Sequence, residues 1–311
     1  MIPKVNKSVK HLIISILENE IFEKLKKTRK DFIVSVLWYI LSIKGRINFL
    51  QLGRFSPLTE QTYRNHFEKE FDFLSFNKQL INQVVSDECI IAFDPSYIPK
   101  AGKSTYGNGR YWSGVAGATK RGLDICGFAV VDIVNNTALH LNAWQTPPAD
   151  ELAEKGLNLL SHYASLVTEN AEQFKSFSNY VVADAFFSKR PFVKKVQSTG
   201  LEFISRLRDD SVLMYKFTGD RTGKKGAPKK FDGLVDAYNF NPNQFSLDLS
   251  NEEITIYSLV VYSKAFKMDI KLAIAIFYKH GRETARKLYF STDLKQAGEK
   301  IVRYYQARFQ I

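Results

Sequence analysis

Two aspartates each follow directly on a short apolar run. The run 89–93 ends at Asp94, and the run 180–183 ends at Asp184. Such runs predict buried strands, and a carboxylate at the mouth of a buried strand is costly unless it is paired. Because Mg²⁺ prefers carboxylate oxygens, the pair predicts a metal site that acts on phosphodiesters. The alternative is that each aspartate only caps the turn after its strand.

The charge of the chain points to a polyanionic partner. Of 311 residues, 45% are hydrophobic and 24% charged, as in ordinary globular proteins, and the net charge is +12. A basic balance favours DNA or RNA as the partner, although a protein can be basic without binding either. The sequence contains no Walker-type loop, which argues against an NTPase.

The cysteines and the apolar segments bear on the compartment. Cys89 and Cys126 both lie in apolar runs, which predicts buried free thiols in a reducing compartment and no structural zinc site. The apolar stretch 32–43 is too short to span a bilayer. Lys4 to Glu23 reads as an amphipathic helix and not as an export signal. We therefore expect a cytoplasmic, nucleoid-associated protein without a membrane segment.

Residues 1–86 are expected to form a helical domain. Helical spacing covers 12–25 and 31–44, and a short helix is expected at 47–52. Ser56-Pro57 resembles an N-cap followed by proline at the first helical position. The next helix is polar and basic, so the order is compatible with a DNA-binding helix-turn-helix or with an ordinary helical bundle.

From Cys89 onward the pattern predicts an α/β fold, a mixed sheet flanked by helices. Three strands are expected at 89–94, 123–134 and 137–144, followed by a long helix at 150–171. A strand at 180–184, a helix at 189–198 and a strand at 202–207 follow. Both aspartates would then lie at carboxyl ends of strands, where open α/β sheets place their sites.

A β-rich, basic insertion is expected at 208–252. Its loop contains Lys224 and Lys225, which we expect to contact the DNA backbone. Strands at 254–263, 271–278 and 287–291 and a final helix from about Asp293 to Ile311 return the chain to the core, which would comprise 87–207 and 253–311.

The segment 100–121 interleaves basic and aromatic side chains next to Asp94. We expect phosphate contacts from Lys100, Lys103, Arg110 and Lys120. The alternative is a solvated hairpin loop. Among the remaining acids, Asp124 and Asp132 lie in a predicted strand whose faces the sequence does not assign.

Four segments resemble the DDE transposases of bacterial insertion sequences, in the branch with a β insertion before the third acid. They are 91–100 (IAFDPSYIPK), 181–187 (VVADAFF), 203–209 (FISRLRD) and 303–311 (RYYQARFQI). The resemblance extends from about Ile47 to the end of the sequence. It implies a ribonuclease H-like core, two divalent ions (Mg²⁺ or Mn²⁺) and cut-and-paste transposition of double-stranded DNA.

The resemblance also assigns residues. Asp94 and Asp184 would be metal ligands, and Tyr305 and Arg308 would contact phosphate or DNA near them. Arg206 and Arg208, in the third matching segment, are expected to contact DNA as well. The N-terminal helices would bind the terminal repeats, and the resemblance implies a homodimer on paired ends.

The family's third acid is not found in this sequence. In the family a helix carries tyrosine, arginine three residues later and glutamate four residues after that. Tyr305 and Arg308 fit, and the glutamate would follow Ile311. We therefore expect a truncated or decayed transposase with little cleavage activity. The alternatives are a stand-alone metal-dependent nuclease and a catalytically dead DNA-binding protein.

Overall fold

The computed structural model describes residues 7–102, 104–219 and 228–311. The chain separates into two compact units, Met1–Val84 and Val85–Ile311. In the described residues, no helix has the length and apolarity needed to cross a bilayer.

The first unit is helical. Its elements are α1 (Lys7–Leu17), η1 (Glu20–Phe22), α2 (Lys27–Ser42), α3 (Phe49–Phe55), α4 (Glu60–Phe67) and α5 (Phe73–Ile81). Its core joins apolar residues from most of these helices, with Tyr63 fully buried. The N-cap expected at Ser56 is wrong. Thr59 caps α4 through its side chain, whereas the Ser56 hydroxyl accepts a 2.7 Å hydrogen bond from Tyr63.

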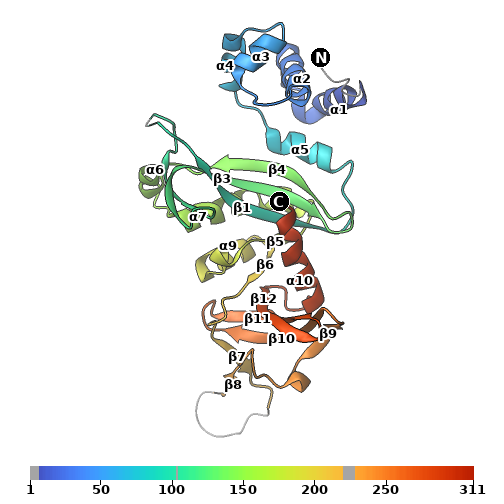
Figure 1. Cartoon of the computed structure of the whole chain (residues 1–311), viewed down its shortest axis with the longest axis vertical. Coiled ribbons are helices and arrows are strands. Elements are labelled where there is room, and N and C mark those ends of the chain that lie inside the picture. The colour runs from blue at the N-terminus through green and yellow to red at the C-terminus, as the bar shows by residue number, and fades with distance from the viewer. Residues whose placement is uncertain (1–6, 103, 220–227) are drawn as a thin grey trace. The chain divides into compact units, whose positions relative to one another are not determined.

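The second unit is built on one mixed sheet (Figure 1). The sheet order is β2-β3-β1-β5-β6-β12-β11-β10-β7-β8, with β4 paired to β3 and β9 paired to β10. The first strands are β1 (Cys89–Pro99), β2 (Gly109–Ser113), β3 (Ala118–Asp132), β4 (Thr137–Gln145), β5 (Tyr180–Val182) and β6 (Glu202–Arg206). The others are β7 (Leu213–Lys216), β8 (Phe231–Leu234), β9 (Ser246–Ser250), β10 (Ile254–Ser263), β11 (Met268–Lys279) and β12 (Arg282–Ser291).

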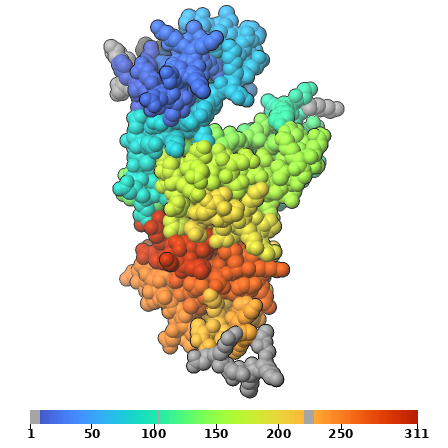
Figure 2. Space-filling view, turned by 180° about the vertical axis from the view of Figure 1, so that it is seen from behind, coloured from blue at the N-terminus to red at the C-terminus, as the bar shows by residue number. Residues whose placement is uncertain are grey.

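Helices cover both faces of this sheet. The aromatic face, which carries Phe93 and Phe128, packs against Phe187 and against Phe192 of α9 (Arg190–Gln197). On the other face, α10 (Gly298–Ala307) contacts β6, β12, β11 and β10. Figure 1 shows α9 and α10 on either side of β5 and β6, and Figure 2 shows the dark red C-terminal residues against the orange strands. The expected mixed sheet flanked by helices is confirmed.

The long helix expected at 150–171 is wrong. The structure has α6 (Ala149–Glu154), α7 (Leu159–Glu169) and α8 (Ala171–Lys175) in its place. Gly156 adopts φ +67°, which ends α6, and a reciprocal cap between Asn158 and Ser161 starts α7. The final helix also starts later than expected, at Gly298, and ends in η4 (Arg308–Gln310).

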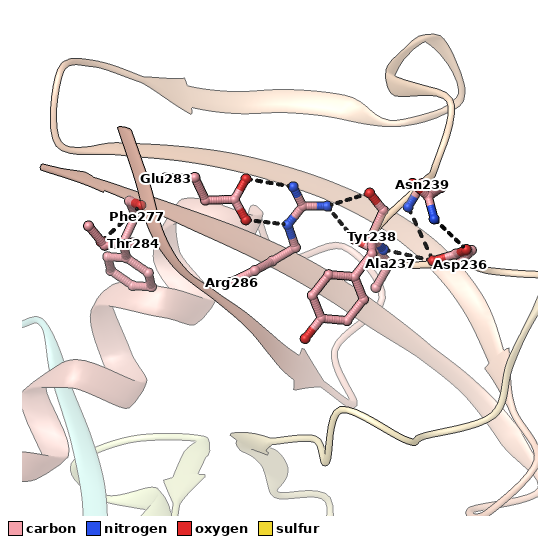
Figure 3. A network of polar contacts seen from close by, with 8 residues as sticks. All are labelled: Asp236, Ala237, Tyr238, Asn239, Phe277, Glu283, Thr284 and Arg286. Atoms are coloured by element: carbon pink, nitrogen blue, oxygen red, sulfur yellow. Dashed lines mark hydrogen bonds and ion pairs between the residues drawn. The ribbon is translucent and has the colours of Figure 1, made fainter. Parts of the chain in front are cut away.

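The segment expected as an insertion continues the same sheet through β7, β8 and β9 and contains η3 (Pro242–Gln244). Arg286 of β12 donates to the carbonyls of Ala237 and Tyr238, at 2.8 Å each, and pairs with Glu283 (Figure 3). The Asp236 carboxylate accepts from the amides of Tyr238 and Asn239. These contacts tie the turn after β8 to the sheet.

Candidate metal-binding and nucleic-acid site

Strand register brings the two aspartates together. β1 and β5 are parallel neighbours, with Ile91 opposite Val181 and Ala92 opposite Val182. Two residues further along, Asp94 lies beside Asp184 at the carboxyl ends of the strands, where adjacent strands are about 4.8 Å apart. The Asp184 charge raises the pKa of Asp94, as expected for neighbouring carboxylates.

The sequence predicted that β1 ends at Asp94, and this prediction is wrong. It continues to Pro99, paired with β3 from Asp94 opposite Gly127 to Pro99 opposite Gly122. Because β5 ends at Val182, β1 is an edge strand beyond this point, and there a proline without an N–H donor is tolerated. Asp94 therefore lies within a strand that runs past the site.

Both carboxylates lie on the sheet face that α10 covers. Side chains alternate along a strand, and Ala92 and Val182, two residues before each aspartate, pack with Tyr304 and Tyr305 of α10. Arg308, directly after α10, is 8% exposed and its Nη1 lies 3.5 Å from Asp94 Oδ1. The C-terminal helix thus places a buried cation over the carboxylate pair.

The electrostatics of the pair favour an additional cation. Burial raises the pKa of Asp94, while Arg308 lowers it and Asp184 raises it. Burial also raises the pKa of Asp184, opposed by the Phe186 amide, by Arg308 and by Lys189. The pKa of both carboxyls stays raised despite Arg308 and Lys189, so the compensation of charge is incomplete.

Asp184 also caps the turn after its strand, as the alternative interpretation required. Its Oδ1 accepts a 3.0 Å hydrogen bond from the Phe186 amide at the start of η2 (Ala185–Phe187). Its carbonyl accepts a 2.8 Å bond from Ser205 of β6. The cap therefore fixes the Asp184 carboxylate at the end of β5.

The donor set fits a hard divalent cation. Mg²⁺ is commonly held by one or two carboxylates and keeps several waters. The Asp94 side chain is 45% exposed, so solvent reaches it. Within the described ranges, no group of three or more histidines, cysteines, aspartates or glutamates could hold a metal.

A cavity of about 300 Å³ opens beside Asp94. Its lining includes Ser96, His140, Gln310 and Ile311. The residues that follow Arg308 therefore border the same space as Asp94. Arg308 Nε is buried and has no hydrogen-bond partner in the described structure. An orphaned buried donor beside an open cavity suits an anionic ligand such as a phosphate.

The predicted DNA contacts fall in different places. Arg206 ends β6, next to β5, and is about one third exposed. Lys100, Arg110 and Lys120 are exposed on or beside β1, β2 and β3. Arg208 pairs with Asp210 at 3.1 Å in an exposed loop. Lys103, Lys224 and Lys225 lie outside the described residues.

Tyr305 lies in the interior and not at the surface. It is 7% exposed, and its ring packs at a tilt against the Tyr289 ring, with the centroids 5.0 Å apart. Its place in the core positions α10, whereas Arg308, three residues later, reaches the carboxylates.

Two residues near the site were missed by sequence reasoning. Lys189 lies with Nζ 3.8 Å from the ring centre of Phe186, which is 45% exposed, and its charge lowers the pKa of Asp184. Both follow Asp184 within five residues, so proximity to a predicted strand end was the available signal. Asp124, by contrast, lies on the opposite face, buried and bonded to Tyr163 at 2.7 Å and to Thr146.

A comparison with protein families gives a match over this part of the chain. The family model described as DDE superfamily endonuclease matches residues 69–239, more than half of the sequence. The matched segment contains both aspartates and β1 to β8. No curated protein matches the chain.

Proposed function

The chain belongs to the DDE superfamily endonucleases, and on that premise we propose that it is a DNA transposase of the insertion-sequence type. The observation that carries the proposal is the pairing of Asp94 and Asp184 at the ends of adjacent parallel strands, under Arg308. The proposed reaction is metal-dependent cleavage of DNA at element ends and transfer of the freed strand.

The proposed core is ribonuclease H-like. Its strands would be β4-β3-β1-β5-β6, in which β1, β5 and β6 run parallel and β3 runs antiparallel to β1. This sheet, with the helices on its two faces, would be the catalytic scaffold, and β7 to β9 would be the insertion. The proposed boundaries remain 87–207 and 253–311 for the core and 208–252 for the insertion.

Each residue near the pair has a proposed role. Asp94 and Asp184 would hold Mg²⁺ or Mn²⁺, which when bound activates the attacking water or hydroxyl and stabilises the leaving oxygen. Arg308, with its free Nε, would hold a phosphate oxygen beside Asp94. Arg206 and Lys189 would attract the DNA backbone along the same edge of the sheet.

We propose that a third carboxylate completes the site. The family's spacing places it four residues after Arg308. Gln310 and Ile311 border the cavity beside Asp94, which supports this place. A chain without that acid should cleave slowly, because two carboxylates hold two divalent ions poorly.

The first unit is proposed to bind the element's terminal repeats. Gly53 of α3 approaches α4 so closely that a Cβ there would lie 3.0 Å from the Glu60 amide nitrogen. This close approach supports a helix-turn-helix pairing of α3 with α4. Gln61, Arg64 and Asn65 lie on the outer side of α4, and such side chains read base edges in the major groove. Two chains on paired ends would form the working assembly in the nucleoid.

The test uses a plasmid that carries the gene's own flanking DNA, incubated with Mn²⁺. We compare the 311-residue chain, the same chain with glutamate added after Ile311, and Asp94→Ala and Asp184→Ala versions of the extended chain. The extended chain should cleave faster than the 311-residue chain, and each alanine variant should lose at least about a thousandfold in rate. Cleavage that survives both substitutions contradicts the proposal.

Joined products separate the candidate enzymes. A transposase transfers the cut end to target DNA, whereas a stand-alone nuclease only cuts. The candidate from another class is a catalytically dead DNA-binding protein. It would bind the repeats without cutting in either chain length.

A further inference from the structure

The β2–β3 ribbon presents two different faces. β2 pairs antiparallel with β3, with Arg110 opposite Arg121, Tyr111 opposite Lys120 and Trp112 opposite Thr119. Residues directly opposite each other point to the same side of a sheet. Arg110, Arg121, Trp112 and Thr119 therefore share one face, and Tyr111 and Lys120 share the other.

The register continues this face to the catalytic edge. Along β3, Arg121 has the same parity as Ile125 and Gly127, and Gly127 lies opposite Asp94. The arginine face of the ribbon is thus the face that carries Asp94. At about 3.3 Å per residue, the six strand positions between Asp94 and the level of Arg121 span roughly 20 Å, which matches about six base pairs of duplex.

The charges on this face have no counter-ions among the residues that the structure describes. Arg110 and Arg121 are exposed, and neither forms an ion pair within the described residues. Two like charges directly opposite each other destabilise a strand pair. Trp112, beside them, is 65% exposed, and it has no ring partner in the described part of the chain. An anionic ligand with an apolar component would satisfy all three side chains.

Duplex DNA is the ligand whose charge and shape fit this face. Its phosphates neutralise arginines, its sugars offer apolar surface to an indole, and its grooves admit a two-stranded ribbon. Building on the proposed function, we propose that Arg110, Arg121 and Trp112 form a flanking-DNA contact that holds duplex beyond the scissile end. Arg110 and Arg121 bind phosphates of this flank, and Trp112 packs on its sugars.

The test measures binding of the whole chain to a fluorescein-labelled 30-base-pair duplex of mixed sequence, by anisotropy at several salt concentrations. Arg121→Ala should weaken binding by about five- to tenfold at 0.1 M salt and lower the salt slope by about 1. The double variant Arg110→Ala/Arg121→Ala should lower the slope by about 2. Lys194→Ala, an exposed cation on α9 at the opposite sheet face, is the matched control and should bind like the original chain.

A variant of the neighbouring residue Lys120 tests whether DNA binding depends on the face of the ribbon and not only on its positive charge. Lys120→Ala removes a positive charge one residue from Arg121 but on the other side of the ribbon, so its loss of affinity should be smaller. Equal losses for the two variants overturn the inference. Melting temperature provides the folding readout. Arg110→Ala and Arg121→Ala should keep or raise it, because each relieves the opposed charges.

A tethered probe gives a second measurement. Iron–EDTA attached to Thr119→Cys should cut the bound duplex more strongly than the same probe on Lys120→Cys. Labelling is selective, because Cys89 and Cys126 are buried and burial raises the pKa of both thiols, that of Cys89 to about 11. Cutting that is equal from both faces overturns the inference.

The outcomes separate this inference from the proposed function. If the original chain does not bind the duplex, both fail. If it binds and Arg121→Ala binds equally well, only the inference fails. If Arg121→Ala weakens binding but no version of the chain cleaves DNA with Mn²⁺, the duplex contact of this face stands, and both its place beyond a scissile end and the transposase proposal fail.

Discussion

Arg308 compensates part of the negative charge of the carboxylate pair. It is buried, lies 3.5 Å from Asp94, and lowers the pKa of both aspartates. Its guanidinium also lies over the Phe309 ring, 4.5 Å from the centroid. Burial nevertheless leaves the pKa of each aspartate above its ordinary value. At neutral pH both aspartates therefore carry negative charges that the folded chain stabilises poorly. A bound cation would compensate these charges.

Removing one of these charges should not weaken the fold. A carboxyl whose pKa is higher in the folded state than in the unfolded state destabilises the folded state above the unfolded pKa of about 3.9. Asp94→Asn should therefore melt at the same temperature at pH 7 or up to about 3 °C higher, while losing metal-dependent cleavage. The difference should shrink as the pH falls towards 4. A melting temperature several degrees lower would mean that the Arg308 contact is mainly structural.

Asp132 shows the opposite shift, which is typical of a structural carboxylate. Burial works to raise its pKa, but hydrogen bonds from the amides of Asn135 and Ser86 and from their side chains outweigh burial and hold the pKa well below its usual range. Its contribution to stability is present above the unfolded pKa of about 3.9 and is lost as the pH falls below it.

Asp132→Asn should accordingly lower the free energy of unfolding by about 1–3 kcal/mol at pH 7. The gap to the original chain should narrow below about pH 4, because the unfolded state there binds a proton at Asp132 that the folded state does not bind. Urea unfolding at pH 7 and pH 3 measures this. The control is Asp87→Asn, which should show neither effect. Asp87 is exposed and directly follows Ser86 in the segment before β1.

At the scale of elements, α10 determines whether Arg308 reaches the site. The helix starts at Gly298, whose amide donates a 2.6 Å hydrogen bond to Asp248 of β9. A Cβ at this position would meet the Asp248 carboxylate and lie 2.8 Å from Ser258 Cβ. The start of the helix is therefore fixed against β9 and β10, ten residues before Arg308.

Gly298→Ala should shift α10 and with it Arg308. We expect a loss of about 1–3 kcal/mol in the free energy of unfolding, from overpacking, together with slower cleavage by the glutamate-extended chain. Glu299→Ala, exposed on the same turn, should change neither. If Gly298→Ala cleaves at the normal rate, the position of Arg308 at the site does not depend on the start of α10.

The same elements show what local sequence patterns can predict. The apolar runs located β1 and β5, because burial on both sides of a strand leaves a continuous apolar signature. They did not reveal that β1 continues through Pro95 to Pro99, because pairing with β3 decides this. The break at Gly156 was missed because a single glycine within a helical pattern is ambiguous until its φ is known.

The sequence predicts the candidate site to the same extent as it predicts the fold. Each aspartate was visible as the end of an apolar run, but their closeness depends on the parallel pairing of β1 with β5, which joins residues ninety positions apart. Arg308 was assigned near the pair only through a family resemblance, since nothing in its own segment specifies which strands α10 covers. The buried position of Tyr305 likewise follows from that packing.

At the scale of the whole molecule, the net charge of +12 suits a polyanionic partner, and the two units would contact that partner through different groups. The second unit carries the carboxylate pair and the arginine face of the ribbon, whose contacts would be to phosphate. The first unit carries Gln61 and Asn65 on the outer side of α4, which would read bases. Affinity and sequence preference should therefore depend on different residues.

Gln61→Ala combined with Asn65→Ala should reduce the preference for the gene's flanking DNA over mixed-sequence duplex by about tenfold, because each bidentate bond to a base edge contributes about 1–3 kcal/mol of discrimination. Arg110→Ala/Arg121→Ala should weaken binding to both duplexes equally and leave the preference unchanged. Competition binding at fixed salt distinguishes the two. A preference that survives the α4 double variant would place base reading elsewhere.

The proposed chemistry requires that Asp94 and Asp184 hold one divalent metal centre between them. Electron paramagnetic resonance of Mn²⁺ titrated into the whole chain measures this directly, because bound Mn²⁺ loses its free-ion signal. We predict a binding site at millimolar Mn²⁺ that Asp94→Asn and Asp184→Asn each abolish, while Asp87→Asn retains it. Mn²⁺ binding that is unchanged in both active-site variants, or absent from the original chain, would contradict this requirement.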